Sequence, residues 1–140
     1  MSEAKEAQGS CLCGSVKITA KKLGETVGAC HCGMCRKWSG GPLMAVDCGQ
    51  SLTLSGEDFI STYNSSEWAE RAFCRNCGSN LYYRLKQNSQ YIVCAGLFDQ
   101  NEFVFDHELF IEEKPKYYNF SEDTKKITGE ELFAAFSSQN

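Results

Sequence analysis

Residues 30–41 read CHCGMCRKWSGG, and the organisation of the chain is clearest when it is followed outward from this stretch. Three cysteines stand close together in it: Cys30, Cys32 and Cys35. Thiolates packed this closely favour a thiophilic metal, zinc before any other. A structural zinc site is closed by four protein ligands, whereas a catalytic zinc keeps one position open. The stretch therefore predicts a zinc site that takes its fourth ligand from elsewhere in the chain or from a substrate.

Length, charge and terminal sequence narrow the class of protein. A chain of 140 residues fits one domain, which we expect over residues 10–140 after a disordered leader over residues 1–9. The net charge of −4 argues against a nucleic-acid partner. The leader lacks the hydrophobic segment of a secretory signal, and no apolar run approaches the ~20 residues of a membrane helix. We therefore expect a cytoplasmic protein, in which cysteines serve metals or catalysis before disulfides.

Short strands separated by turn residues dominate the rest of the chain. Alternating and apolar runs predict strands at residues 15–21, 26–29, 43–48, 51–54, 59–63, 68–74, 81–85 and 91–98, and in part of 103–112. Thr128 and Glu131 form a capping box ahead of an apolar stripe, which predicts a C-terminal helix. One further turn of helix is expected near Trp38. This pattern is typical of a mainly β fold of coiled antiparallel sheets with a short C-terminal helix.

Four more cysteines fall into two close pairs: Cys11 with Cys13, and Cys74 with Cys77. If the backbone is extended, residues i and i+2 face one side, so Cys11 and Cys13 would present both sulfurs to one ion. The second pair has the spacing of a zinc knuckle, and Gly78 after it accommodates a tight backbone. The two pairs are enough to close one structural zinc site. Spacing alone leaves open a site built from one pair and two cysteines of residues 30–35.

The sequence offers several candidates for the fourth ligand of the cysteines at residues 30–35. They are His31, Cys48, Cys94 and His107. If Cys30 and Cys32 point one way, His31 points the other way, which argues against it. Isolated cysteines in apolar surroundings are more often small buried residues than ligands.

Four motifs together resemble the glutathione-dependent formaldehyde-activating enzyme family, to which the centromere protein V-like proteins belong. They are CLCGSV at residues 11–16, CHCxxCRK at 30–37, TY at 62–63 and FCxxCGSxL at 73–81. The resemblance covers residues 9–120 and implies a β-tent-like fold. It also implies two zinc sites: a closed structural site held by Cys11, Cys13, Cys74 and Cys77, and a site held by Cys30, Cys32 and Cys35 that is open to a thiol. One departure is Tyr117-Tyr118, where many relatives carry a tryptophan.

Three thiolates around Zn²⁺ leave a net charge of −1, and such a zinc should prefer a soft fourth ligand. Glutathione fits as this ligand, because Arg36 and Lys37 could bind its carboxylates and Trp38 could form a wall of its pocket. The alternative is that both cations are solvated and that the Trp38 ring belongs to the core. The expected activity is that of a carbon–sulfur lyase, in which Cys30, Cys32 and Cys35 form the catalytic centre for addition of the thiol to formaldehyde or a related aldehyde, or for the reverse.

Two other classes of protein remain open. One is a non-catalytic carrier of glutathione or another thiol, and the other is a structural or interaction protein with two closed zinc sites. A redox enzyme of the methionine-sulfoxide-reductase kind is less favoured, because Cys94 has no adjacent charged residue to activate it.

Overall fold

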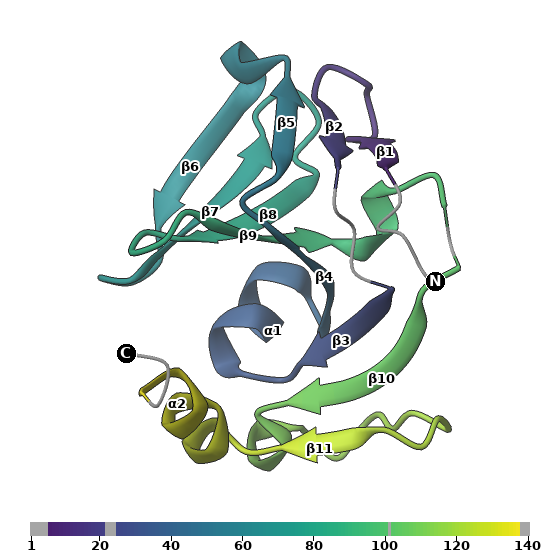
Figure 1. Cartoon of the computed structure of the whole chain (residues 1–140), viewed down its shortest axis with the longest axis vertical. Coiled ribbons are helices and arrows are strands. Elements are labelled where there is room, and N and C mark those ends of the chain that lie inside the picture. Colours follow the sequence, from purple (N-terminus) through teal and green to yellow (C-terminus); the bar gives the residue numbers. More distant parts are fainter. Residues whose placement is uncertain (1–5, 22–24, 101, 138–140) are drawn as a thin grey trace.

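The structure is a computed structural model that describes residues 6–21, 25–100 and 102–137. Within these ranges the chain forms two sheets and two α-helices (Figure 1). The smaller sheet has the order β1-β2-β5 and consists of β1 (Ala7–Ser10), β2 (Lys17–Ala20) and β5 (Leu52–Ser55). The larger sheet has the order β11-β10-β3-β4-β9-β8-β7-β6 and consists of β3 (Thr26–Cys30), β4 (Leu43–Gly49), β6 (Ile60–Asn64), β7 (Ala69–Cys74), β8 (Asn80–Leu85), β9 (Gln90–Cys94), β10 (Val104–Leu109) and β11 (Lys125–Ile127). The helices are α1 (Gly33–Ser39) and α2 (Gly129–Ser137), and short 3-10 helices cover Glu57–Phe59, Ala95–Leu97 and Ile111–Glu113.

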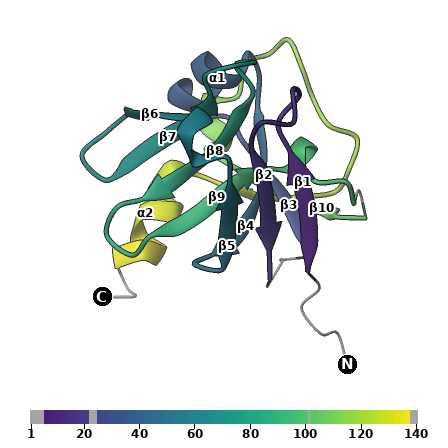
Figure 2. The same cartoon turned by 90° about the horizontal axis from the view of Figure 1, so that it is seen from above.

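The two faces of the larger sheet pack against different elements. One face packs against the smaller sheet, and residues such as Val46, Tyr82 and Val93 form the main core there. Their chain neighbours point to the opposite face, where Tyr83 and Cys94 pack in a second cluster with residues of α1. The larger sheet curves around α1, with β8 and β9 on one side of the helix and β10 and β11 on the other (Figure 1). The smaller sheet lies on the face of the larger sheet that points away from α1 (Figure 2).

The mainly β fold with a short C-terminal helix is confirmed. The pairings are antiparallel, as expected, except that β10 runs parallel to both β3 and β11. The capping box is also present, because Glu131 N–H donates to Thr128 Oγ1 at 3.1 Å and Thr128 N–H donates to Glu131 Oε1 at 3.0 Å.

Two segments differ from the sequence prediction. The disordered leader expected over residues 1–9 is wrong for its last residues, since Ala7–Ser10 form β1 and Ala7 is fully buried; residues 1–5 lie outside the described residues. Gly9 also bridges Phe98, and a side chain at Gly9 would collide with the Leu97 carbonyl. The strand expected over residues 91–98 ends at Cys94, because the chain turns through Ala95–Leu97 to make this bridge.

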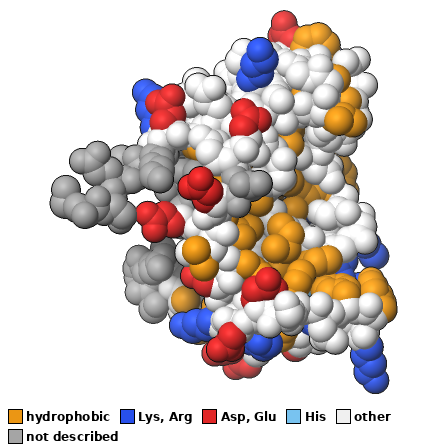
Figure 3. Space-filling view, turned by 90° about the vertical axis from the view of Figure 1, so that its right-hand side faces the viewer, with side chains coloured by type: hydrophobic (Ala, Val, Ile, Leu, Met, Phe, Trp, Pro, Cys, Tyr) orange, Lys and Arg blue, Asp and Glu red, His pale blue; other side chains and the backbone are white. Residues whose placement is uncertain are grey.

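The outer surface carries mixed charge. On the face shown in Figure 3, hydrophobic side chains gather across the middle and lower part, and acidic and basic side chains are interspersed around them. No helix in the described part of the chain is long and apolar enough to cross a membrane.

Candidate metal centres

The two cysteine pairs meet in space at the main core, which includes Cys11 and Cys74. Cys11, Cys13, Cys74 and Cys77, here called the four-cysteine group, have all sulfur atoms within 4.8 Å of one another. The Cys11 and Cys13 sulfurs are 3.6 Å apart, and those of Cys13 and Cys74 are 3.8 Å apart. These separations allow all four sulfurs to share one metal ion.

A tight turn, rather than the extended backbone considered above, brings Cys11 and Cys13 together. Gly14 N–H donates to the Cys11 carbonyl at 3.1 Å, and Gly14 takes a φ of 82° that favours glycine. Gly78 plays the same part after the second pair, with a φ of 80° and an N–H that donates to the Cys74 carbonyl at 2.7 Å. Both turns therefore depend on a glycine just after the last cysteine.

Hydrogen bonds from nearby residues favour the thiolate form of Cys13 and Cys77, whereas burial raises the pKa of Cys74. Cys13 Sγ and Ser15 Oγ share a hydrogen bond of 3.2 Å, which lowers the pKa of Cys13 to about 7. Cys77 Sγ and Ser79 Oγ share one of 3.2 Å, which lowers the pKa of Cys77 to about 5. Val16 N–H donates to Cys11 Sγ at 3.3 Å. Because metals bind the thiolate and not the thiol, these contacts favour metal binding.

The second group consists of Cys30, Cys32 and Cys35 and is called the three-cysteine group below; its sulfurs also lie within 4.8 Å of one another. Cys30 ends β3, and Cys35 lies within α1. Cys32 is the N-cap of α1, and its sulfur accepts a hydrogen bond of 3.3 Å from Cys35 N–H. The helix therefore begins on one candidate ligand and carries the next one a turn later.

Within the described residues, no further His, Asp, Glu or Cys brings a ligand atom into this three-cysteine group. His31 is fully buried and is held by other partners. Cys48 lies in the main core on the opposite face of the sheet. His107 packs over Gly28, and its Nδ1 lies 2.6 Å from Asp106 Oδ1. Cys94 packs in the same apolar cluster as the group, where burial raises the pKa of its thiol to about 12. All nine cysteines are free of disulfides.

His31 anchors the short segment between Cys30 and Cys32. Its Nε2 lies 2.8 Å from Glu108 Oε1 on β10, and its Nδ1 lies 2.7 Å from the Tyr118 hydroxyl. The Thr124 hydroxyl donates to the other Glu108 oxygen. Burial alone would raise the pKa of Glu108, but the hydrogen bonds from Thr124 and His31 outweigh it and keep that pKa below its ordinary value. Sequence analysis did not identify Glu108, because nothing local marks its pairing with His31.

Arg71 on β7 is a second residue that sequence analysis missed. It is buried, with 7% of its surface exposed, and its Nη2 lies 3.7 Å from Cys35 Sγ. Its guanidinium carbon is 5.0 Å from the Trp38 ring centre and 5.3 Å from that of Tyr83. Its Nε and Nη1 have no hydrogen-bond partner in the described part of the chain. The strand predicted over residues 68–74 carries both Glu70 and Arg71, and only the fold shows that Arg71 is on the buried side.

The three residues predicted to contact a ligand all lie on α1 but face different surroundings. Trp38 is half-buried, packs beside the three-cysteine group, and is held by a hydrogen bond of 3.0 Å from Asn80 Nδ2 to its carbonyl. Arg36 is half-buried and donates from Nε to the His31 carbonyl at 2.9 Å. Lys37 is exposed. The structure thus places Trp38 next to the sulfurs and gives Arg36 a partner within the chain.

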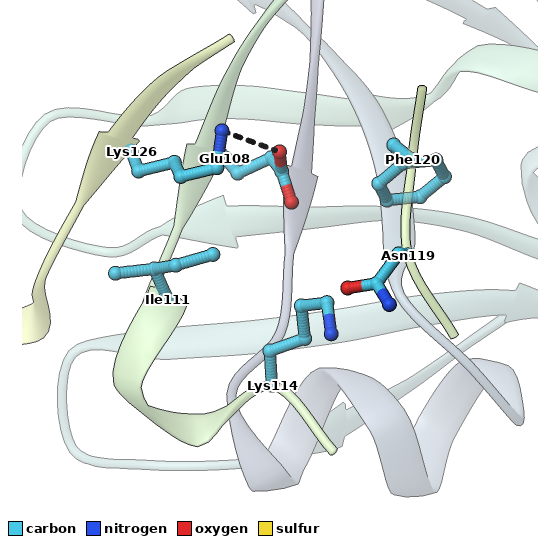
Figure 4. A pocket seen from close by; sticks show the side chains of 6 residues that line it. All are labelled: Glu108, Ile111, Lys114, Asn119, Phe120 and Lys126. Carbon is cyan, nitrogen blue, oxygen red and sulfur yellow. Dashed lines mark ion pairs between the residues drawn. The ribbon is translucent and has the colours of Figure 1, made fainter. Parts of the chain in front are cut away.

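A cavity of about 260 Å³ opens beside this region (Figure 4). It is lined by Glu108, Ile111, Lys114, Asn119, Phe120 and Lys126. Lys126 Nζ lies 3.9 Å from Glu108 Oε2, the ion pair drawn in Figure 4. No cysteine lines the cavity. Glu108 lines it and contacts His31, which stands between Cys30 and Cys32 in the sequence.

Comparison with known proteins identifies the family of this chain. The family described as glutathione-dependent formaldehyde-activating enzyme matches residues 6–113. The chain belongs to this family. It is 36% identical over 129 residues to a protein of Schizosaccharomyces pombe described as an uncharacterized lyase, covering 91% of this chain and 94% of that protein.

A solved structure shares the fold of this family member. It is a crystal structure of a Rhodobacter sphaeroides protein, with a TM-score of 0.58 and 24% sequence identity. The match covers 67% of this chain and 89% of that one. At this level of identity the likeness supports the fold alone.

Proposed function

We propose that this family member is a zinc-dependent carbon–sulfur lyase that binds glutathione or a similar thiol at the three-cysteine group. It promotes addition of the thiol to formaldehyde or a related aldehyde, or the reverse release. The observation that carries the proposal is the incomplete donor set: three sulfurs close enough to share a metal, with no fourth protein ligand among the described residues. The match to the formaldehyde-activating family and the lyase relative support the reaction class.

The four-cysteine group fits a structural zinc ion. Four sulfur ligands are the donor set of closed zinc sites, and a Zn–S distance of about 2.3 Å places tetrahedral sulfurs about 3.8 Å apart. The separations of 3.6 and 3.8 Å in the structure agree with this spacing. This zinc ion would tie the turn after β1 to the end of β7, which are distant in sequence.

The three-cysteine group fits a zinc ion that keeps one ligand position for substrate. A zinc ion bound by Cys30, Cys32 and Cys35 would supply a Lewis acid at which a thiol loses its proton and becomes a better nucleophile. The chain's own residues then do the positioning. The His31–Glu108 contact fixes the segment that carries two of the sulfurs, and Trp38 packs beside them. Lys37 is exposed on the same helix and is available to a carboxylate of glutathione.

The proposal is tested by three measurements on the purified, metal-loaded protein. Elemental analysis should find two zinc ions per chain, one for each cysteine group. Calorimetry in two buffers of different ionisation enthalpy should detect glutathione binding with release of a proton. Exchange NMR should show faster interconversion of formaldehyde and its glutathione adduct than in the absence of protein.

Each alternative class predicts a different result. Glutathione binding with proton release but without faster exchange would identify a thiol carrier. Two zinc ions with no heat on addition of glutathione would identify a structural protein whose second site is closed. A single zinc ion, or the absorption spectrum of an iron–sulfur cluster, would contradict the two-zinc assignment.

A further inference from the structure

Arg71 presents an unsatisfied cation to the three-cysteine group. Its guanidinium is always charged, and two of its nitrogens, Nε and Nη1, are buried without a hydrogen-bond partner in the part of the chain that the structure describes. Burying donors of a charged group without partners is among the costlier defects in a folded protein. Such a group at a candidate site indicates that its partner is a ligand rather than another residue.

Charge balance alone does not account for these donors. A guanidinium near three thiolates offsets their negative charge, and the Nη2 contact with Cys35 Sγ is enough for that. A lysine would offset it equally well. Nε and Nη1 add fixed hydrogen-bond directions, which have a use only if an acceptor lies in the plane of the guanidinium.

The geometry places these donors where the ligand reacts. Nη2 belongs to both edges by which a guanidinium binds oxygens, one shared with Nε and the other with Nη1. Because Nη2 contacts Cys35 Sγ, both edges lie beside the three-cysteine group. Trp38 and Tyr83 pack against the guanidinium and help to keep it from water, and Tyr83 lies directly across from Arg71 on β8. Donors shielded from water stabilise developing charge more strongly than exposed ones.

We propose that Arg71 is a catalytic residue, and that one of its free donors, Nε–H or Nη1–H, binds the aldehyde oxygen while this oxygen carries negative charge. This inference rests on the proposed function. In the addition, the thiolate sulfur forms a bond to the carbonyl carbon, and the C=O π electrons move onto the oxygen. Arg71 stabilises this alkoxide until it takes a proton from solvent to give the hemithioacetal. In the reverse direction the hydroxyl loses its proton, the C=O bond forms again, and the C–S bond breaks.

The aldehyde oxygen is a better candidate than a glutathione carboxylate for this position. The oxygen of the adduct is separated from the sulfur by one carbon, so it must lie close to the sulfurs of the group. The carboxylates of glutathione lie many bonds from its sulfur and can reach the exposed end of α1, where Lys37 stands.

Binding of two small thiols tests the inference without measuring activity. Ethanethiol has no oxygen, whereas thioglycolate carries carboxylate oxygens near its sulfur. The zinc-loaded wild type should bind thioglycolate about 10- to 100-fold more tightly than ethanethiol, the range expected for hydrogen bonds to a charged group. Arg71→Lys keeps the charge but not the fork of donors, so it should keep its affinity for ethanethiol and lose most of this preference.

Arg84→Lys is the matched control, because Arg84 lies on β8, pairs with Glu70 at 2.8 Å and faces away from Tyr83. It should behave like the wild type in both measurements. Lys37→Ala should also keep the preference for thioglycolate. In exchange NMR with glutathione and formaldehyde, Arg71→Lys should slow adduct exchange about 100-fold, as loss of an oxyanion donor does in other enzymes. Its zinc content should not change.

Three results would overturn the inference. The first is a wild type that binds thioglycolate less than about twofold more tightly than ethanethiol. This result does not depend on whether any variant folds. Retention of both the preference and the exchange rate by Arg71→Lys would reduce Arg71 to a charge-balancing residue. If Arg71→Lys binds glutathione more weakly but keeps the exchange rate of the wild type, the guanidinium binds a carboxylate of glutathione and not the aldehyde oxygen. If the wild type binds no thiol at all, the proposed function fails together with the inference.

Discussion

The two cysteine groups are assembled in different ways. The sulfurs of the four-cysteine group receive hydrogen bonds mostly from the two turns that carry them, for example from Val16 N–H to Cys11. The three-cysteine group depends on contacts between distant parts of the chain. His31 pairs with Glu108, 77 positions away, and Gly33 N–H at the start of α1 donates to Glu113 Oε1, 80 positions away. The first group joins two turns that are distant in the sequence and supplies four sulfurs, whereas the second has three sulfurs within six residues whose segment is held by distant residues.

One strand connects the two groups. Cys74 lies on β7 with its side chain in the main core, and Arg71 on the same strand points to the opposite face, toward Cys35. Loss of the four-cysteine group should therefore disturb both sites. Loss of a ligand in the three-cysteine group should leave the other site and the main core intact. The predictions below test this asymmetry, beginning with the largest expected effect.

Cys74→Ser should abolish cooperative folding. Cys74 is fully buried, and the substitution opens the closed site that joins residue 11 to residue 77. A structural zinc site contributes on the order of 10 kcal/mol to folding, more than most domains of this size can lose. Thermal melting followed by circular dichroism should show no cooperative transition. Cys48→Ala is the control, because Cys48 is equally buried but is not in either group; it should cost about 1–2 kcal/mol.

Glu108→Ala should be the next most damaging change, and it should act on the three-cysteine group first. Removal of the carboxylate leaves His31 Nε2 and the Thr124 hydroxyl without their shared buried acceptor, at a cost of about 3 kcal/mol. Zinc should become easier to remove by chelator from one site and not from the other. Glu113→Ala removes a carboxylate of the same kind from the surface and should cost about 1 kcal/mol or less. Equal effects of the two variants would contradict the importance of the buried pair.

Acid titration tests the His31–Glu108 contact through the direction in which stability changes with pH. The pKa of Glu108 in the folded protein lies below its ordinary value of 4.5. The stability due to this carboxylate is therefore fully present above about pH 4.5 and is lost as the pH falls through the depressed value. Glu108→Gln, which cannot titrate, should lose less stability than the wild type between about pH 5 and pH 3. Zinc content is measured at each pH in both proteins, so that stability is compared only where the two proteins hold the same amount of zinc. Parallel curves for both proteins would show that Glu108 does not stabilise the fold through its charge.

These contrasts explain which features could be predicted from the sequence. Spacing of two or three residues identified the clustered cysteines, although their division into two groups came from the resemblance to the family. The capping box at Thr128 gave the C-terminal helix. Most strands were also predicted, because alternation along one segment reflects which face is buried. Each of these signals lies within a few residues of the feature that it predicts.

Features that depend on distant partners could not be predicted in this way. β1 has little apolar character and is a strand because β2 and Phe98 pair with it. β11 forms only against β10, and its three residues give no pattern of their own. Glu108 and Arg71 are ordinary charged residues in the sequence until the fold buries them beside His31 and Cys35. The incomplete site was therefore the part that sequence analysis described least well.

Cys32→Ser should separate metal binding from folding. Serine is a good N-cap, so its hydroxyl can replace the Cys32 sulfur in accepting the Cys35 N–H at the start of α1. The helix should remain, with a change in stability of about 1 kcal/mol or less from the cap. Elemental analysis should find one zinc ion fewer per chain, and binding of thiols should be lost. Damage to the fold equal to that of Cys74→Ser would mean that both groups are structural.

The smallest expected effect concerns the cations on α1, and it decides how the thiol is chosen. Arg36 already donates to the His31 carbonyl, so Arg36→Ala would disturb the three-cysteine group as well as any ligand. Lys37 is exposed, and Lys37→Ala is therefore the cleaner test.

If Lys37 binds a glutathione carboxylate, the wild type should prefer glutathione over 2-mercaptoethanol, and Lys37→Ala should reduce that preference by about 0.2–1 kcal/mol, the range for an exposed ion pair. The loss should also shrink as salt is added, because exposed charges are screened. Lys86→Ala, at another exposed lysine on the β8–β9 turn, should change neither affinity. A preference for glutathione that survives both Lys37→Ala and high salt would place the peptide recognition at buried groups such as Arg71 instead.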